Sequence, residues 1–427
     1  MIRILKRSEV GDNEIFARAV PQVDVESVVA EVIRRVRAEG DAALFEFCEK
    51  WDGAKLTSLR VTPEEINEAV AAVDPEFLEI LKEAAENIRR FHEKQVRVSF
   101  LQNEQAGVVT GQKIIPLDRA GLYVPGGTAA YPSTVLMDAI PARIAGCREV
   151  VMVTPPDKQG KINPVILAAA SVAGVDQIYK VGGSQAIAAL AYGTESIPRV
   201  DKIVGPGNAF VAEAKKQVYG TVAIDMIAGP SEILIVADNS AKANYVAADL
   251  LSQAEHDRLA SAVLVTNDEA LANEVQAEIE RQLPLLARAE IARESIDKNG
   301  KIILTATVDE AIEISNAIAP EHLELCVADP FALLDRVRHA GSIFMGNYCP
   351  EALGDYFAGP NHTLPTSGTA RFSSPLSVDD FVKKTQYTYY TAEALTRVAE
   401  KVAYFADREG LTAHARSARI RLEDGEA

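Results

Sequence analysis

The sequence contains little cysteine, and its thiols are widely spaced. Four cysteines occur in 427 residues, at Cys48, Cys147, Cys326 and Cys349, and none of them forms a Cys-x-x-Cys pair. Disulfide-stapled domains and thiolate zinc sites need numerous or closely spaced cysteines. The pattern therefore argues against both classes and indicates reduced thiols in the cytoplasm.

The chain also lacks an excess of positive charge and any long apolar run. Its 44 basic and 61 acidic side chains give a formal net charge of −17, with no basic stripe to offset it. Nucleic acid and anionic membrane surfaces are therefore not expected as partners. No apolar segment approaches the length of a membrane span, and the basic segment 1–7 runs into polar residues, unlike a secretory signal. We expect a soluble cytoplasmic protein.

The order of sequence patterns predicts an α/β fold. The first hundred or so residues show helical periodicity, whereas from about Gly121 short β-branched runs alternate with glycine turns and helical stretches. A second such series begins near Glu232, so two parallel sheets are expected. The expected regions are a helical N-terminal region over residues 1–120 packing on the second sheet domain, a first α/β domain over 121–230, a second over 231–375, and a small, mostly helical C-terminal tail over 376–427.

Three of the six histidines stand near acidic residues. The three groups are Glu255-His256-Asp257, Glu321-His322, and His414 five residues after Glu409. Imidazole is the commonest metal ligand and the one side chain that titrates near neutral pH. The groups therefore indicate metal binding or proton transfer.

Two of these groups have a functional and a structural interpretation. Gln253 and His256 are three residues apart on the last turn of a predicted helix, so both can face one ion. Alternatively, His256 only interacts with the carboxyl end of the helix dipole. Glu321 and His322 precede a predicted strand and can act on two different protons as general acid or base. Alternatively, they are surface residues at the start of a strand.

A loop rich in glycine, proline and asparagine contributes further candidates, Asp355 and His362. Asp355 is a hard oxygen ligand, and it joins Gln253, His256 and His414 in a mixed nitrogen and oxygen set. Such a set suits zinc with open positions better than calcium or a cysteine-based zinc site.

A glycine turn between a predicted strand and helix raises a different function. Residues 205–208 (GPGN) offer backbone N–H groups at a helix start, which suits a phosphate. However, no Gly-x-Gly-x-x-Gly follows a strand, and the glycines can equally serve only a tight turn. A dinucleotide is therefore only weakly indicated by this turn.

Taken together, these stretches resemble the histidinol dehydrogenase family. The resembling blocks follow one another in order and are 121–127 (GLYVPGG), 182–186 (GGSQA), 204–210 (VGPGNAF), 228–232 (AGPSE), 252–257 (SQAEHD), 319–324 (APEHLE) and 359–365 (GPNHTLP).

The resemblance implies oxidation of L-histidinol through L-histidinal to L-histidine, with two NAD used in succession and one zinc ion per subunit. It also implies two Rossmann-like but incomplete parallel sheets, and a homodimer with shared active sites in which the carboxyl-terminal segment reaches the neighbouring subunit.

Residue roles follow from the same resemblance. His322 would take the alcohol proton, and Glu321 would activate the water that attacks the aldehyde. The implied zinc ligands are Gln253, His256, Asp355 and His414. The implied substrate contacts are Ser231, Gln253, His256, His322, Asp355, His362, Glu409 and His414. The implied NAD contacts are Tyr123, Gln185 and Asn208.

Three other functions fit parts of the sequence. The chain can be a related zinc and NAD dehydrogenase of another small alcohol, a zinc hydrolase in which Glu321 activates water, or a non-enzymatic two-lobed binding protein. The glycine turns count against the hydrolase, and the Glu321–His322 pair counts against the binding protein.

Overall fold

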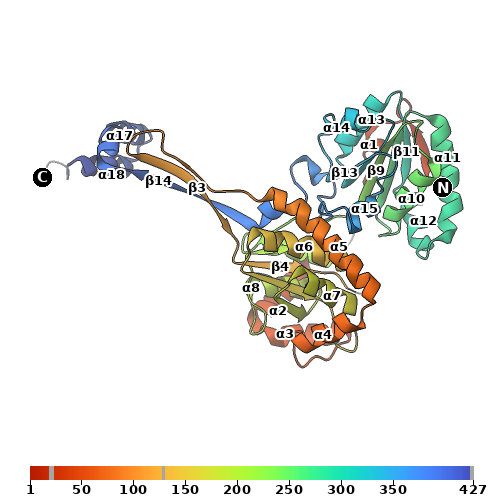
Figure 1. The fold of residues 1–427 in the computed structure, drawn as a ribbon, viewed down its shortest axis with the longest axis horizontal. Coiled ribbons are helices and arrows are strands. Elements are labelled where there is room, and N and C mark those ends of the chain that lie inside the picture. Colours follow the sequence, from red (N-terminus) through yellow and green to blue (C-terminus); the bar gives the residue numbers. More distant parts are fainter. Residues whose placement is uncertain (19–23, 127–129, 424–427) are drawn as a thin grey trace. The chain divides into compact units, whose positions relative to one another are not determined.

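A computed structural model describes residues 1–18, 24–126 and 130–423, so Gly127 of the first resembling block lies outside the described residues. The chain forms two compact units (Figure 1). The first comprises Met1–Gln95 and Leu117–Phe381, and the second comprises Val96–Pro116 and the segment that begins at Val382.

The first unit contains a five-stranded parallel sheet in the order β6-β5-β4-β7-β8. Its strands are β4 (Arg119–Tyr123), β5 (Glu149–Thr154), β6 (Gln177–Lys180), β7 (Lys202–Val204) and β8 (Ala223–Ile224). The connecting helices are α6 (Pro132–Ala145), α7 (Pro164–Ala173), α8 (Gly183–Tyr192) and α9 (Ala209–Val218). The central strands β4, β5 and β7 each begin with a charged residue and continue with mainly apolar, buried residues, as expected for a parallel sheet that is covered on both faces.

The first unit also contains a six-stranded parallel sheet in the order β1-β11-β10-β9-β12-β13. Its strands are β1 (Arg3–Lys6), β9 (Glu232–Ala237), β10 (Ser261–Thr266), β11 (Lys301–Leu304), β12 (His322–Cys326) and β13 (Ser342–Met345). The helices of this part are α1 (Asp12–Ile15), α10 (Ala243–Ala254), α11 (Glu269–Gln282), η3 (Leu283–Leu285), α12 (Ala289–Lys298), α13 (Val308–Ile318), α14 (Phe331–Leu334) and α15 (Glu351–Tyr356). The predicted α/β class with two parallel sheets is confirmed.

The N-terminal helices differ from expectation in the sheet that they cover. Their bounds are α2 (Glu26–Glu39), α3 (Asp41–Phe47), η1 (Cys48–Asp52), α4 (Pro63–Ala72), α5 (Pro75–His92) and η2 (Glu93–Gln95). The apolar faces of α2 to α5 join the two cores around the first sheet, whereas only β1 and α1 join the second sheet domain. Periodicity identifies an apolar face but not its partner, which explains the difference.

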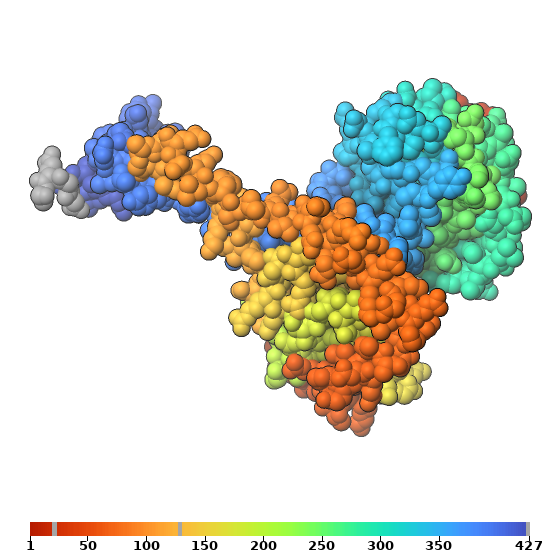
Figure 2. Space-filling view, in the orientation of Figure 1, coloured from red at the N-terminus to blue at the C-terminus, as the bar shows by residue number. Residues whose placement is uncertain are grey.

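The second unit is built around an antiparallel sheet in the order β14-β3-β2. Its strands are β2 (Phe100–Gln102), β3 (Val108–Pro116) and β14 (Val382–Tyr390), followed by α16 (Ala392–Thr396), α17 (Ala399–Arg408) and α18 (Thr412–Glu423). Figure 2 shows the orange surface of the β2–β3 segment against the blue carboxyl-terminal segment. The predicted tail over 376–427 is thus divided: residues 376–381 belong to the first unit, and the segment from Val382 begins with a strand and forms the larger part of the second unit, whose other part is residues 96–116.

Short helices complete the first unit at η4 (Thr369–Arg371) and η5 (Val378–Phe381). Among the described residues, no helix is both long enough and apolar enough to cross a membrane.

Candidate active site

The adjacent residues Glu321 and His322 lie at the amino end of β12, beside the amino end of the neighbouring strand β9. The main chain of Glu232, the first residue of β9, binds both side chains. Its N–H donates to Glu321 Oε2 over 2.9 Å, and its carbonyl oxygen lies 3.0 Å from His322 Nδ1. One residue of a neighbouring strand therefore orients the whole pair.

His322 presents a basic nitrogen without a partner. Because the Glu232 carbonyl can only accept, Nδ1 carries the proton of the neutral ring and Nε2 holds the free lone pair. Nε2 is buried and has no hydrogen-bond partner. Burial lowers the pKa of His322 to about 4, against the opposing effect of Asp355, so the ring is neutral at pH 7. The arrangement suits a general base.

Glu321 is the complementary group of the pair. Its side chain is buried, and this burial raises the pKa of its carboxyl well above the usual value. The Glu232 N–H opposes the shift, while the nearby carboxylates of Glu232, Glu351 and Asp355 add to it. Once ionised, such a carboxylate is a stronger base than an exposed one.

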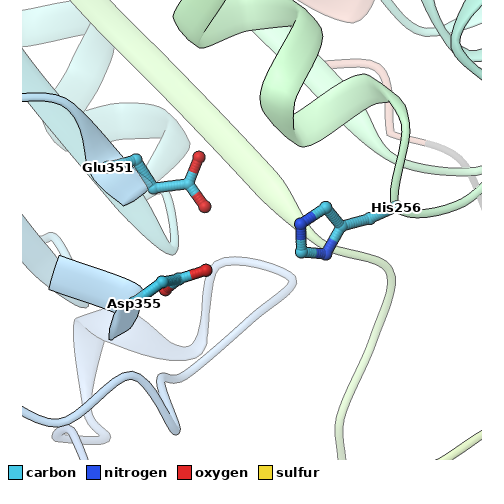
Figure 3. A group of neighbouring side chains, drawn as sticks. All are labelled: His256, Glu351 and Asp355. Atoms are coloured by element: carbon cyan, nitrogen blue, oxygen red, sulfur yellow. The ribbon is translucent and has the colours of Figure 1, made fainter. Parts of the chain in front are cut away.

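Three ligand atoms converge beside this pair. His256, Glu351 and Asp355 each bring one potential ligand atom, and these atoms lie within 4.8 Å of one another. Glu351 and Asp355 are four residues apart on α15, so both carboxylates project from one face of the helix. In Figure 3 the two carboxylates face the imidazole of His256, which comes from the loop after α10.

His322 borders this cluster. His322 Nε2 lies 3.8 Å from Glu351 Oε1 and 3.9 Å from Asp355 Oδ1. Burial raises the pKa of Glu351 to about 8, with a further contribution from Asp355, and Ser252 opposes the shift by donating a hydrogen bond over 3.1 Å. The carboxyl of Glu351 is buried and that of Asp355 is partly buried, and a cation between two carboxylates this close would lower the free energy of bringing them together.

Gln253 supplies an independent sign that a ligand binds here. The residue is completely buried on the last turn of α10, and neither its amide oxygen nor its amide nitrogen has a hydrogen-bond partner. A buried amide without partners is rare in proteins. With imidazole nitrogen and carboxylate oxygen nearby in the sequence and the fold, the donor set fits zinc.

The structure places the other predicted substrate contacts around the same cluster, with two exceptions. His362 Nδ1 lies 3.1 Å from the Asp355 carbonyl oxygen, and its Nε2 lies 3.4 Å from Thr134 Oγ1 on α6. Ser231 immediately precedes Glu232 at the start of β9. Glu409 and His414 instead belong to the second unit, where both are exposed beside and on α18.

The predicted cofactor contacts lie at the carboxyl edge of the first sheet. The Tyr123 hydroxyl, at the end of β4, accepts a hydrogen bond of 3.1 Å from Gly183 N–H at the start of α8. Gln185 is buried on the same helix, and its amide oxygen has no partner. Asn208 caps α9 by accepting from the N–H groups of Phe210 and Val211. Carboxyl edges of parallel strands are where such folds bind nucleotides.

Glu351 is the one residue of this cluster that the sequence pattern did not identify. A signal was present, because Glu351 and Asp355 have the spacing that aligns side chains on a helix. The segment 350–359 contains two glycines and a proline and was interpreted as a loop. Only the folded chain shows that α15 forms there and turns both carboxylates toward His256.

Comparisons with known proteins agree on one family. The family model described as histidinol dehydrogenase matches residues 17–422. The chain is 58% identical over 400 residues to a histidinol dehydrogenase of Bacillus cereus, covering 94% of this chain and 93% of the relative. It is 52% identical over 428 residues to that of Clostridium acetobutylicum, covering 99% of each. The crystal structure of histidinol dehydrogenase from Elizabethkingia anophelis superposes with a TM-score of 0.95 at 38% identity, covering 100% of this chain and 99% of that chain.

Replacing Gln253 by leucine is expected to stabilise the protein in the presence of a chelator. The change removes a buried amide without partners, so the free energy of unfolding should rise by about 1 kcal/mol or more. Denaturant titration measures the change. The neighbouring Ser252→Ala is the control, since it deletes a hydroxyl that donates to Glu351 and should destabilise. If the Gln253→Leu protein is less stable than wild type, the Gln253 side chain stabilises the fold, and its lack of partners is then no sign of a ligand site.

Proposed function

The chain belongs to the histidinol dehydrogenase family of NAD-dependent oxidoreductases, and we propose that it oxidises L-histidinol through L-histidinal to L-histidine, the last two steps of histidine biosynthesis. The observation that carries this proposal is the buried Glu321–His322 pair, in which one residue offers a neutral imidazole with a free nitrogen and the other a carboxyl. A two-stage oxidation needs both groups, because an alcohol proton and a water proton are removed in turn.

We assign the zinc site to Gln253, His256 and Asp355, with His414 as the fourth ligand. The amide of Gln253 without partners and the His256–Asp355 proximity support the first three. A bound zinc ion would supply a positive charge that orients the amino group and imidazole of the substrate. Glu351 brings a carboxylate oxygen within 4.8 Å of the ligand atoms of His256 and Asp355 and would balance part of the charge of a bound ion.

His322 takes the alcohol proton at Nε2 as hydride leaves the carbinol carbon for NAD, which becomes NADH. Glu321 then accepts a proton from the water that attacks the aldehyde, and protonated His322 returns its proton to the carbonyl oxygen, which gives the hydrate. The hydrate loses a second hydride to a second NAD while His322 takes the proton of its hydroxyl group, which leaves the carboxylic acid. The hydrogen bonds to Glu232 keep both side chains aimed during the two stages.

We place Ser231, His362 and Glu409 against the substrate, together with the zinc ligands and His322. We place Tyr123, Gln185 and Asn208 against NAD. Two observations support these NAD contacts: the amide oxygen of Gln185 has no hydrogen-bond partner, and Asn208 is exposed at the start of α9.

Glu409 and His414 are proposed to complete the site of a neighbouring subunit in a homodimer. The second unit has a small hydrophobic core. The buried residues of the cluster formed by α17 and α18 are five alanines. These helices and the turn between them expose large apolar side chains, namely Val402, Tyr404, Phe405, Leu411 and Ile420. Exposed apolar side chains around so small a core fit a surface that a second copy covers.

The cytoplasm is the proposed location. All four cysteines are free thiols, and Cys48, Cys147 and Cys326 are buried, as expected for a protein kept in a reducing compartment.

Two molecules of NADH should form for each L-histidinol consumed. The balance follows from two successive hydride transfers, and absorbance of NADH against remaining histidinol measures it. A yield of one NADH would show that oxidation stops at the aldehyde. Turnover of another small alcohol in place of histidinol would favour a related dehydrogenase, and hydrolysis without NAD would favour a zinc hydrolase.

His322→Asn is expected to lower turnover by roughly 10²-fold or more while zinc content stays near one ion per subunit. Asparagine keeps the hydrogen bond to the Glu232 carbonyl but has no basic nitrogen. His256→Ala is the matched variant and should lose zinc. Metal analysis beside steady-state rates separates the two, and the opposite pattern of zinc loss would reverse the assignments.

Mixing two inactive variants tests the shared site. In dimers that combine His256→Ala with His414→Ala, one of the two sites would have both ligands intact, so refolded equal mixtures should regain about one quarter of wild-type activity. Each variant refolded alone is the control. Absence of recovery, with dimers present by light scattering, would place Glu409 and His414 in the site of their own subunit.

A further inference from the structure

Asp138, on α6, is a completely buried carboxyl that belongs to neither the zinc cluster nor the catalytic pair. Its Oδ1 accepts a hydrogen bond of 2.9 Å from the Thr363 hydroxyl. Its Oδ2 is buried and has no hydrogen-bond partner. An ionised carboxylate in this position would leave a charged oxygen without solvent or a donor.

The Asp138 carboxyl lies against the turn at Gly205, between β7 and α9. A Cβ atom on Gly205 would lie 3.0 Å from Asp138 Oδ2 and 2.2 Å from the Tyr123 carbonyl oxygen. Gly205 has a φ of +110°, so only glycine fits both this conformation and this space. Asp138 Oδ2 and the Tyr123 carbonyl oxygen thus crowd the same point of the turn.

The nearest cation is already neutralised. Lys215 Nζ forms an ion pair with Asp225 Oδ1 and donates to the Gly205 carbonyl over 2.9 Å, while Asp225 Oδ2 accepts from the Gly205 N–H over 2.8 Å. Lys215 and Asp225 are both buried and carry opposite charges. Ionisation of Asp138 would therefore leave this buried group with a net negative charge.

The other groups around Asp138 do not supply a positive charge. His92, at the end of α5, contacts the side chain of Asn361. His362, which follows Asn361 in the chain, contacts Thr134 of α6. Burial lowers the pKa of both histidines. On η5, Asp380 is paired with Lys202.

We propose that Asp138 is a neutral carboxylic acid that accepts a hydrogen bond from Thr363 and donates its own proton from Oδ2 to the Tyr123 carbonyl oxygen, thereby fixing the Gly205 turn against the segment Asn361–Thr363. Asp138 is then a positioning residue. It connects the segment that carries His362 with the turn that leads to Asn208, and this consequence for the reaction rests on the proposed function.

The electrostatics agree with the geometry. Burial raises the pKa of Asp138 to about 8, with a further contribution from Asp225, while Thr363 and Lys215 oppose the shift. The folded protein therefore binds a proton that the unfolded chain, with an ordinary pKa of 3.8, has lost. Stability contributed by this position is greatest below the unfolded pKa, falls as the pH rises, and levels off above the folded pKa.

Asp138→Asn tests the proton directly, because an amide N–H can replace the carboxyl O–H at the same place. We expect the variant to melt several degrees above wild type near pH 8 and within about one degree of it near pH 4 to 5. The infrared difference spectrum between the two proteins at pH 7 should contain the carbonyl band of a protonated acid. Asp225→Asn is the control, since it breaks the ion pair with Lys215 and should lower the melting temperature.

A melting temperature of Asp138→Asn below that of wild type, or the absence of the protonated-acid band, would overturn the proposal, since an ionised Asp138 would attract Lys215. These two measurements do not depend on activity. They therefore remain decisive if the protein forms no NADH, a result that would refute the proposed function alone.

The positioning role has its own readout. The KM for NAD of wild type should rise as the pH passes about 8, the folded pKa of Asp138, while that of Asp138→Asn should lack this rise. Asp138→Leu, which has neither hydrogen bond, should have a raised KM at every pH with a smaller change in kcat. Identical pH profiles for wild type and Asp138→Asn would contradict the role.

Discussion

Desolvation of ionisable groups at the start of β12 is the constraint on which the rest of the site depends. Glu321, His322, Glu324 and Glu351 are all buried there. A charge on any one of them, without a partner, would destabilise the folded protein because the charged group has lost its contact with water. The neutral imidazole of His322 and the raised pKa of Glu321 are direct consequences. The same burial that makes the region costly in stability thus prepares both members of the pair for proton transfer.

A bound metal ion would change this electrostatic balance. Glu351 and Asp355 project from one turn of α15 toward His256, and the amide of Gln253 is buried without a partner on the last turn of α10. None of these features stabilises the chain by itself, since each places polar atoms where protein partners are missing. A cation would satisfy them together. The site is therefore better explained as a binding surface than as part of the structural core.

The sequence predicted residue types and local spacing better than it predicted partners. Local periodicity predicted the helix before His256 and the strand after Glu321, and α10 and β12 form close to those positions. His256 itself was predicted on the last turn of the helix but lies beyond the end of α10, since helix ends are poorly specified by local pattern. Glu351 was missed because its helix spans only six residues within a segment rich in turn formers. The partner of α2 to α5 and the pairing of β3 with β14 depend on contacts between residues far apart in the chain, and local pattern does not encode these.

Acidic side chains beside the first sheet are neutralised in a different way from those beside the second sheet. We attribute the difference to the ligand proposed for each place. Around the Gly205 turn, Lys215 matches Asp225 and a proton matches Asp138, so the turn is held by fixed internal partners. Around β12 the protein supplies no cation of its own to Glu351 and Asp355 among the described ion pairs, and His322 stays neutral. A rigid turn suits a cofactor that must enter and leave twice in one turnover. Carboxylates without a permanent cation suit a resident metal, because an internal lysine there would compete with that metal for the same oxygens.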